Sequence, residues 1–319
     1  MFEVRSHADV CAEFQLVKLD KNLNPVDESG VSCNTVLNQG LDLIGYKDDW
    51  INAVIVGTGN STPNVNQTGL DAPFMVSKNR ISAGLTYEAT PTPRYILTTV
   101  FRYNSGSFNN ITLAEVAAGN SINTNIPNFV AFNRALLKDN EGSPTTITIL
   151  SDESLEVRMK LYIYVETSDV MQTINIVDGS NTVKSAVNLT IRPCKLGDLG
   201  TADALSAWKA VAAYGFGSLG YPAGYAGDIG TSSGIPEGSE FWSLMTSGVS
   251  FVSDAYVIGN YYNTGKIIVG LDAGNGSTKS LFIRGFVDHK QVGISPAISK
   301  NNTQVLTIPI KRSWGRYIP

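Results

Sequence analysis

Residues 155–165 read Leu-Glu-Val-Arg-Met-Lys-Leu-Tyr-Ile-Tyr-Val. Apolar side chains occupy every second position from Leu155 to Val165, and the positions between them are charged or tyrosine. A period of two places alternate side chains on opposite faces of an extended chain. The segment therefore predicts a β-strand whose odd-numbered face is buried and whose even-numbered face meets solvent.

Similar segments occur on both sides of this strand. They are rich in β-branched and aromatic residues and are separated by Gly, Asn and Pro, as is typical of short strands joined by turns. They lie at residues 13–19, 93–103, 145–150, 171–178, 186–192, 249–259, 266–272, 279–287 and 304–311. The pattern predicts a mainly β protein with two β-sandwich or barrel-like domains, residues 1–167 and 168–319, joined near Ser168 and Asp169.

One or two short helices are expected besides the strands. Asn34 is a candidate N-cap for a helix in which Val36, Leu37, Leu41 and Ile44 fall near helical spacing. A second helix is predicted at residues 202–214, where apolar residues recur on one stripe.

The composition narrows the classes of function. Charged residues make up 16% of the chain and the net charge is −4, without a basic run, so the electrostatic footprint of a nucleic-acid-binding protein is missing. The first residues do not resemble a signal peptide and no apolar segment is long enough to cross a bilayer, so we expect no membrane insertion. Three irregularly spaced cysteines, Cys11, Cys33 and Cys194, predict free thiols in a protein made in a cytoplasm.

Catalytic signals are weak. The only histidines are His7 and His289, which leaves little scope for His-based metal sites or nucleophile–histidine pairs. Paired acids occur at residues 48–49 and 152–153, but adjacent acids next to strands are most often solvated turn residues, and glycoside hydrolysis needs two facing carboxyls. We therefore expect no enzyme activity, no catalytic residues, no metal and no cofactor.

Two glycine-rich turns invite comparison with phosphate loops. Residues 267–279 resemble the first phosphate loop of actin-like ATPases, in which Gly lets N–H groups approach a phosphate and an acid such as Asp272 holds Mg²⁺ through water. About forty residues follow, too few for the rest of a nucleotide cleft. A hairpin closed by Asn275 and Gly276 is the preferred interpretation. Residues 57–63 lack a lysine and a following helix, and predict a plain turn.

Aromatic residues gather in two places that suggest contacts with a partner. Residues 215–234 contain seven glycines and predict a long loop, which in a compact domain is usually functional or disordered. Interface centres favour aromatic residues and arginine, and exposed aromatics also bind sugar faces. The candidate interface or glycan contacts in this loop and in the C-terminal tail are Phe216, Tyr221, Tyr225, Trp314, Arg316 and Tyr317.

Three segments between residues 35 and 166 resemble tail proteins of tailed bacteriophages, including tail-fibre and baseplate-associated proteins. The first is the strand and turn at 54–63, Val-Ile-Val-Gly-Thr-Gly-Asn-Ser-Thr-Pro, followed by Thr68-Gly69-Leu70. The second is 111–116, Ile-Thr-Leu-Ala-Glu-Val. The third is 132–139, Phe-Asn-Arg-Ala-Leu-Leu-Lys-Asp, with 144–153, Pro-Thr-Thr-Ile-Thr-Ile-Leu-Ser-Asp-Glu. Residues 117–119, Ala-Ala-Gly, depart from the glycine plus aromatic expected there, and residues 167–319 show no such likeness.

The resemblance implies a virion structural protein that assembles as a homo-oligomer, with other tail proteins, into a tail, collar or tail-tip complex. Made in the host cytoplasm, it would reside in the virion. The alternatives are a module that binds host surface glycans, an enzyme that degrades them, and a capsid-associated decoration protein. Glycan binding predicts coplanar exposed aromatics in a groove, an enzyme predicts two facing carboxylates, and assembly predicts large neutral interfaces.

Overall fold

The computed structural model describes residues 3–47, 49–88, 90–178, 180, 182–194, 222–231, 234–283 and 289–318. Within these ranges the protein is mainly β, as predicted, with several antiparallel sheets and one α-helix, α1 (Asn38–Tyr46). The second predicted helix, at residues 202–214, lies outside the described residues, as do Phe216 and Tyr221.

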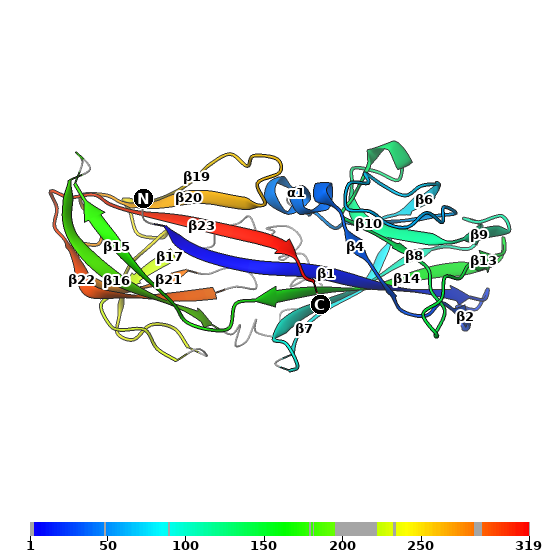
Figure 1. Ribbon diagram of the computed structural model, residues 1–319, viewed down its shortest axis with the longest axis horizontal. Helices are drawn as coiled ribbons and strands as arrows, with labels where there is room; N and C mark the ends of the chain where they lie inside the picture. Colours follow the sequence, from blue (N-terminus) through cyan, green and yellow to red (C-terminus); the bar gives the residue numbers. More distant parts are fainter. Residues whose placement is uncertain are drawn as a thin grey trace.

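One long sheet, sheet 1, runs along the molecule (Figure 1). Its strands follow the order β19–β20–β23–β1–β14–β8–β7, and two short strands, β2 and β3, also pair with β1. The bounds are β1 (Val4–Leu19), β2 (Pro25–Glu28), β3 (Ser32–Cys33), β7 (Arg80–Glu88), β8 (Arg94–Tyr103), β14 (Ser154–Val165), β19 (Val249–Ser253), β20 (Tyr262–Val269) and β23 (Leu306–Arg316).

Two smaller sheets lie toward opposite ends of the molecule (Figure 1). Sheet 2 has the order β4–β12–β10–β5–β6 with β11 beside β10, namely β4 (Thr35–Val36), β5 (Ala53–Gly57), β6 (Pro73–Ser77), β10 (Glu115–Ser121), β11 (Phe129–Ala131) and β12 (Asn133–Leu136). Sheet 3 has the order β15–β16–β22–β21–β17–β18, namely β15 (Val170–Val177), β16 (Val183–Cys194), β17 (Pro222–Tyr225), β18 (Glu240–Ser243), β21 (Gly276–Ile283) and β22 (His289–Lys300). A fourth sheet pairs β9 (Ile111–Leu113) with β13 (Ile147–Ile149), and a short 3-10 helix spans Ile126–Asn128.

The alternation of residues 155–165 has the predicted outcome. The odd-numbered side chains from Leu155 to Ile163 are buried at 1% exposure or less, because β14 presents this face to the largest hydrophobic cluster. On the other face Lys160 is half exposed. Glu156 departs from the pattern and is buried at 7% exposure, since it pairs with Arg102 on the neighbouring strand at 2.6 Å.

Two hydrophobic cores lie along sheet 1. The first core includes side chains of β1, β8, β14, α1 and sheet 2, and the second includes side chains of β20, β23 and sheet 3. Two residues near the ends of β1 and β23 depart from this division. Val4 of β1 belongs to the second core, and Trp314 of β23 belongs to the first. The predicted boundary at 167/168 therefore does not coincide with a break in sheet 1, because strands from both halves of the chain build it.

The helix prediction needs a local correction. Helix α1 begins at Asn38 with Leu37 at the N-cap position, and no side chain caps it. Asn34 instead accepts a hydrogen bond from the Ala12 backbone N–H at 2.8 Å, directly after β3, the short strand that pairs with β1. The strand predicted at residues 249–259 is also shorter, because β19 ends at Ser253.

Candidate functional site

The three segments that carry the phage-tail resemblance meet at one place in sheet 2. Strand β10 lies between β5 and β12, and Glu115 at its start is the register partner of both Gly57 and Leu136. This order brings Glu115 and Arg134 under the loop of residues 58–72, which connects β5 to β6. Residues far apart in sequence are thereby assembled into one polar cluster, which we call the Glu115 network.

Glu115 holds the loop through its backbone. Its Oε1 accepts hydrogen bonds from the N–H groups of Gly59 and Ala72, both at 2.9 Å. Its Oε2 accepts from the Asp71 N–H at 3.2 Å and from Arg134 Nε at 2.8 Å. The carboxylate thus ties together the two ends of the loop.

Arg134 completes the network from the other side. Its Nη2 donates to Asp71 Oδ2 at 2.9 Å, and its Nη1 donates to Gln67 Oε1 at 2.8 Å and to Ser61 Oγ at 3.3 Å. Hydrogen bonds from Ser61, together with the guanidinium of Arg134, lower the pKa of Asp71. Three loop residues are therefore fixed by one side chain.

The glycines of the loop have a steric reason. A Cβ on Gly59 would lie 2.5 Å from Glu115 Oε1, and one on Gly57 would lie 2.5 Å from the Ala72 carbonyl oxygen. Neither contact is tolerable without displacing the carboxylate or the backbone. The Gly-Thr-Gly sequence thus permits the close approach of the loop to Glu115, which is a different purpose from cradling a phosphate. The turn predicted at residues 57–63 is instead the irregular first part of this loop, and its hydrogen-bonded turn lies at residues 64–67.

The start of α1 provides a second attachment for the same loop. Asn38 donates through its backbone N–H to the Val65 carbonyl and through Nδ2 to Asn66 Oδ1, at 2.8 and 2.7 Å. Arg316 in turn donates to Asn38 Oδ1 and, at 2.6 Å, to the Val36 carbonyl. Strand β23 therefore holds the start of α1 through Arg316, and the start of α1 holds the loop of residues 58–72 through Asn38.

The arrangement suits recognition better than chemistry. Glu115 and Arg134 are both 0% exposed, and every oxygen of Glu115 already accepts hydrogen bonds, so the pair is not poised to exchange protons with a substrate. Burying two charges is costly unless their hydrogen bonds are complete, as they are here. What this network presents to solvent is a loop of fixed shape whose exposed residues, Asp71 aside, are uncharged: Thr58, Asn60, Ser61, Thr62, Asn64, Asn66 and Thr68.

The aromatic candidates that the structure describes lie inside the chain's own fold. Tyr225 is 3% exposed and lies in β17, so the long loop predicted at residues 215–234 is interrupted by a strand. Trp314 is 2% exposed and donates through Nε1 to the Leu41 carbonyl at 2.7 Å. Tyr317 stacks on Tyr164 with ring centroids 3.6 Å apart. Trp314 and Tyr225 are thus core residues and not surface anchors, a correction to the sequence-based expectation.

The glycine-rich turn before β21 is not a hairpin. Strand β20 belongs to sheet 1 and β21 to sheet 3, so residues 270–275 cross between two sheets over the second core. Lys300 Nζ donates to the carbonyl oxygens of Leu271 and Ala273 and to Asn275 Oδ1, at 3.1, 2.8 and 2.9 Å. Burial lowers the pKa of Lys300. The turn thus directs oxygen acceptors at a cation, the Lys300 ammonium. A phosphate-binding loop does the opposite, because it directs N–H donors at an anion.

A cluster that the sequence did not reveal lies between β1 and β23. His7 Nδ1 is 2.8 Å from Ser313 Oγ and His7 Nε2 is 3.1 Å from Asp9 Oδ1, the three residue types of a Ser–His–Asp hydrolase but with the two ring nitrogens exchanged. Such an enzyme also needs N–H donors aimed at an oxyanion. Ser313 has a register partner on each side, His7 of β1 and Tyr262 of β20, so the backbone around this hydroxyl is part of the sheet and forms no separate oxyanion-binding turn. The cluster is best explained as a polar contact that joins the two strands.

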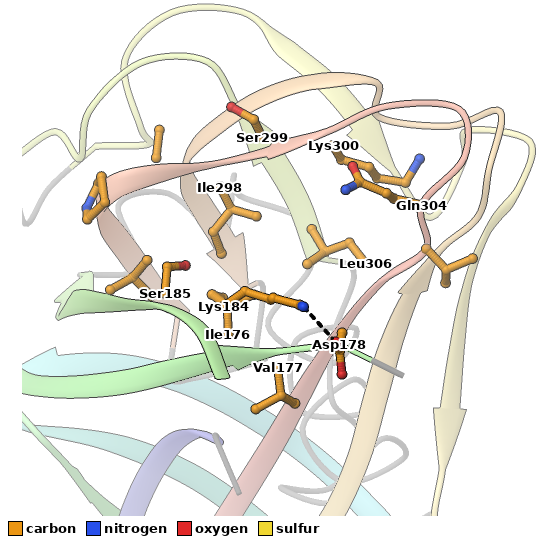
Figure 2. Close-up of a pocket in the computed structure, with 14 residues that line it drawn as sticks. Ile176, Val177, Asp178, Lys184, Ser185, Ile298, Ser299, Lys300, Gln304 and Leu306 are labelled. Carbon is orange, nitrogen blue, oxygen red and sulfur yellow. Dashed lines mark ion pairs between the residues drawn. The ribbon is translucent and has the colours of Figure 1, made fainter. Parts of the chain in front are cut away.

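The described residues also form a groove at the open end of the second core, with a volume of about 600 Å³. Ile176, Ile298 and Leu306 line it together with polar residues, and the ion pair between Lys184 and Asp178, at 2.9 Å, is among its side chains (Figure 2). No aromatic side chain lines the groove and Asp178 is its one carboxylate. Its lining therefore carries neither the coplanar aromatics of a glycan site nor the paired acids of a glycosidase.

Cys11, Cys33 and Cys194 are free, as predicted. In the described part of the chain, no group of three or more His, Cys, Asp or Glu side chains could hold a metal ion. No helix within the described ranges is both long and apolar enough to cross a membrane. Comparison with protein-family models, curated proteins and solved structures finds no match to this chain.

Proposed function

We propose that this chain is a structural subunit of a bacteriophage tail, collar or tail-tip complex, in which it assembles with itself and with other tail proteins. The observation that carries the proposal is the Glu115 network. The residues of the phage-tail resemblance at 57–61, 115 and 134 are those that fix the loop of residues 58–72. A surface loop held this firmly by buried charges is suited to docking a neighbouring subunit without further ordering.

The composition of the loop supports the same role. Its exposed side chains are amides and hydroxyls, which form neutral hydrogen bonds across an interface and avoid the cost of removing charge from water. The whole chain shares this character, since only 16% of its residues are charged. A subunit that covers much of its surface with neighbours is expected to carry few charges.

The alternatives have weaker support. A glycan-binding module needs exposed aromatic faces, whereas Tyr225 and Trp314 are buried and the groove lining has no aromatic ring. A glycan-degrading enzyme needs a second carboxyl facing Asp178 across the groove. A capsid-associated decoration protein would share the neutral loop, and differs from the proposal only in its place in the particle.

The test is to locate the chain in purified phage particles by mass spectrometry and to label it with antibodies in electron micrographs. We expect the label on the tail, and a label on the capsid would favour the decoration protein. A double variant, Asn60→Lys with Thr62→Lys, places charge on the loop and should reduce incorporation, while the control Asn22→Lys in the exposed β1–β2 turn should not. Absence of the wild-type chain from particles would refute the proposal.

A further inference from the structure

Strand β15 forms one edge of sheet 3. Among the described residues it pairs only with β16, so the backbone N–H and C=O groups of alternate residues along its other side have no strand partner. Exposed edges of this kind recruit further strands, and proteins usually protect them with charges, prolines or short length. The sequence of β15, Val-Met-Gln-Thr-Ile-Asn-Ile-Val, has eight residues without a charge or a proline.

The other edges of the two sheets are better protected or shorter. Strand β7 carries Arg80 and Glu88 at its ends and has a register irregularity between Arg80 and Ser82. Strand β18 has four residues including Glu240, and β19 has five. By these criteria β15 is the described edge of sheets 1 and 3 most open to strand addition.

Exposed apolar side chains accompany the open edge. Met171 is 74% exposed, and Val170 and Val177 at the two ends of β15 are 43% and 47% exposed. Val305 beside the groove is 54% exposed. Apolar side chains are thus exposed along the open edge, with Val177 beside the groove and Met171 on the opposite face from Ile174, and soluble proteins often use such exposed apolar residues for contact with a partner.

The charges that flank β15 are already neutralised within the chain. Asp169 accepts from Arg192 Nη2 at 2.7 Å, and Asp178 pairs with Lys184 Nζ at 2.9 Å. A strand that binds this edge therefore gains nothing from carrying charge and should itself be uncharged and extended. Strand β15 meets that description, and a two-fold axis can bring it against its own copy with both edges satisfied.

We propose that β15 pairs antiparallel with β15 of a second copy of this chain across a two-fold axis, so that sheet 3 continues from one subunit into the next. A register centred on Thr173 places Val170 of the second copy opposite Ile176, on the face that carries the groove. It also places Asp178 opposite Ser168 and Asp169 opposite Val177, so no like charges meet. The inference rests on the oligomer of the proposed function but not on its place in a tail.

The experiment measures the molar mass of the full chain by light scattering over a wide range of concentration. We expect twice the chain mass for the wild type. Thr173→Lys, which brings two ammonium groups together at the axis, should reduce the mass to that of one chain. The matched control is Thr86→Lys, the same change at an exposed position of the edge strand β7, and it should leave the dimer intact.

A cross-link provides an independent readout. In a Cys33→Ser background, Thr173→Cys should form a disulfide-linked dimer on mild oxidation, whereas Thr86→Cys should not. This second readout decides the matter if Thr173→Lys loses its far-ultraviolet circular dichroism. A wild type that stays monomeric at every concentration overturns the inference, as does a dimer that neither dissociates with Thr173→Lys nor cross-links through Thr173→Cys. A dimer in solution that is absent from particles would leave β15 pairing standing and remove the tail assignment.

Discussion

Arg134 Nε donates to Glu115 Oε2 at 2.8 Å, and neither side chain is exposed to solvent. The two residues lie on neighbouring strands of sheet 2, where apolar residues would pack more cheaply. The pair is thus retained at a cost in desolvation, and the benefit we identify is the fixed shape of the loop of residues 58–72.

Removing one charge of the pair should destabilise the protein strongly. Glu115→Gln removes the fully buried counter-ion of Arg134 and leaves only Asp71, whose side chain is 31% exposed, and breaking a buried pair typically costs about 3–5 kcal/mol. The measurement is the free energy of unfolding in urea. Glu88→Gln is the control, because the Glu88 side chain is 43% exposed where it pairs with Arg94 and exposed pairs contribute about 0–1 kcal/mol. Equal losses for the two variants would contradict the buried network.

Two glycines of one loop should respond differently to alanine. Gly59→Ala forces a methyl group within 2.5 Å of Glu115 Oε1, and overpacking of this kind costs about 1–3 kcal/mol. Gly69→Ala meets nothing within 4 Å and should change stability by less than about 0.5 kcal/mol. Hydrogen exchange should also show faster exchange of the Gly59 and Ala72 amides in the Gly59 variant alone. Unchanged exchange there would mean that the carboxylate can move aside.

Strand β14 offers a test of the first core. Leu161 is 1% exposed within it, so Leu161→Ala should cost about 2–5 kcal/mol in urea denaturation. The neighbouring Lys160→Ala removes a side chain that is half exposed and should have little effect. A loss below about 0.5 kcal/mol for the leucine would be incompatible with its burial.

Trp314 should behave as a core residue and not as an interface anchor. It stacks near Tyr256, with ring centroids 5.9 Å apart, and its indole N–H is bonded to the Leu41 carbonyl. Trp314→Ala should lower the free energy of unfolding by about 3–5 kcal/mol. Fluorescence-monitored melts at several protein concentrations check this, because an interface residue would make the loss depend on concentration and a core residue would not.

The contribution of Tyr103 to the free energy of unfolding should depend on pH in the alkaline range. Complete burial raises the pKa of Tyr103, whose hydroxyl is directed at the carbonyl oxygens of Val54 and Met75. Because the folded-state pKa exceeds the unfolded value of about 10, this stabilisation is complete below that pH and is lost as the pH rises above it. Wild type should therefore exceed Tyr103→Phe in stability by about 1 kcal/mol at neutral pH, and the difference should shrink above pH ~10. Urea melts of both proteins across this range would show it, and a constant difference would contradict the shift.

Local patterns predicted the strands well because a half-buried strand alternates apolar and polar residues with a period of two. The alternation at residues 155–165 identified β14, and the spacing of Leu37, Leu41 and Ile44 indicated α1. The hairpin expected at Asn275 and Gly276 was wrong, since a turn signal does not say whether the flanking strands pair with each other or enter different sheets. Lys300, which decides that geometry, lies 25 residues from Asn275 and carries no local signal.

The site was predicted only in pieces. The segments at 54–63, 111–116 and 132–139 were singled out by resemblance, and Arg134 is a cation in a segment that also contains the buried Phe132, Asn133 and Ala135. Their convergence depends on the order β12–β10–β5, which no period encodes. Trp314 was misjudged for a similar reason, because aromatic residues suit interfaces and cores alike and only the pairing of β23 with β1 decides between them.

The pairing of β1 with β23 also has a consequence for the order of folding. His7 and Ser313, which face each other across these strands, are 306 residues apart in the chain. During synthesis the early part of β1 can pair with β14 once residue 165 has been made, but its other edge stays open until β23 emerges. Until β23 has been synthesised, Val4 lacks its partners from that strand in the second core, and the first core lacks Trp314. The ribosome-bound intermediate is therefore expected to expose a strand edge, and to depend on chaperones more than either core alone would suggest.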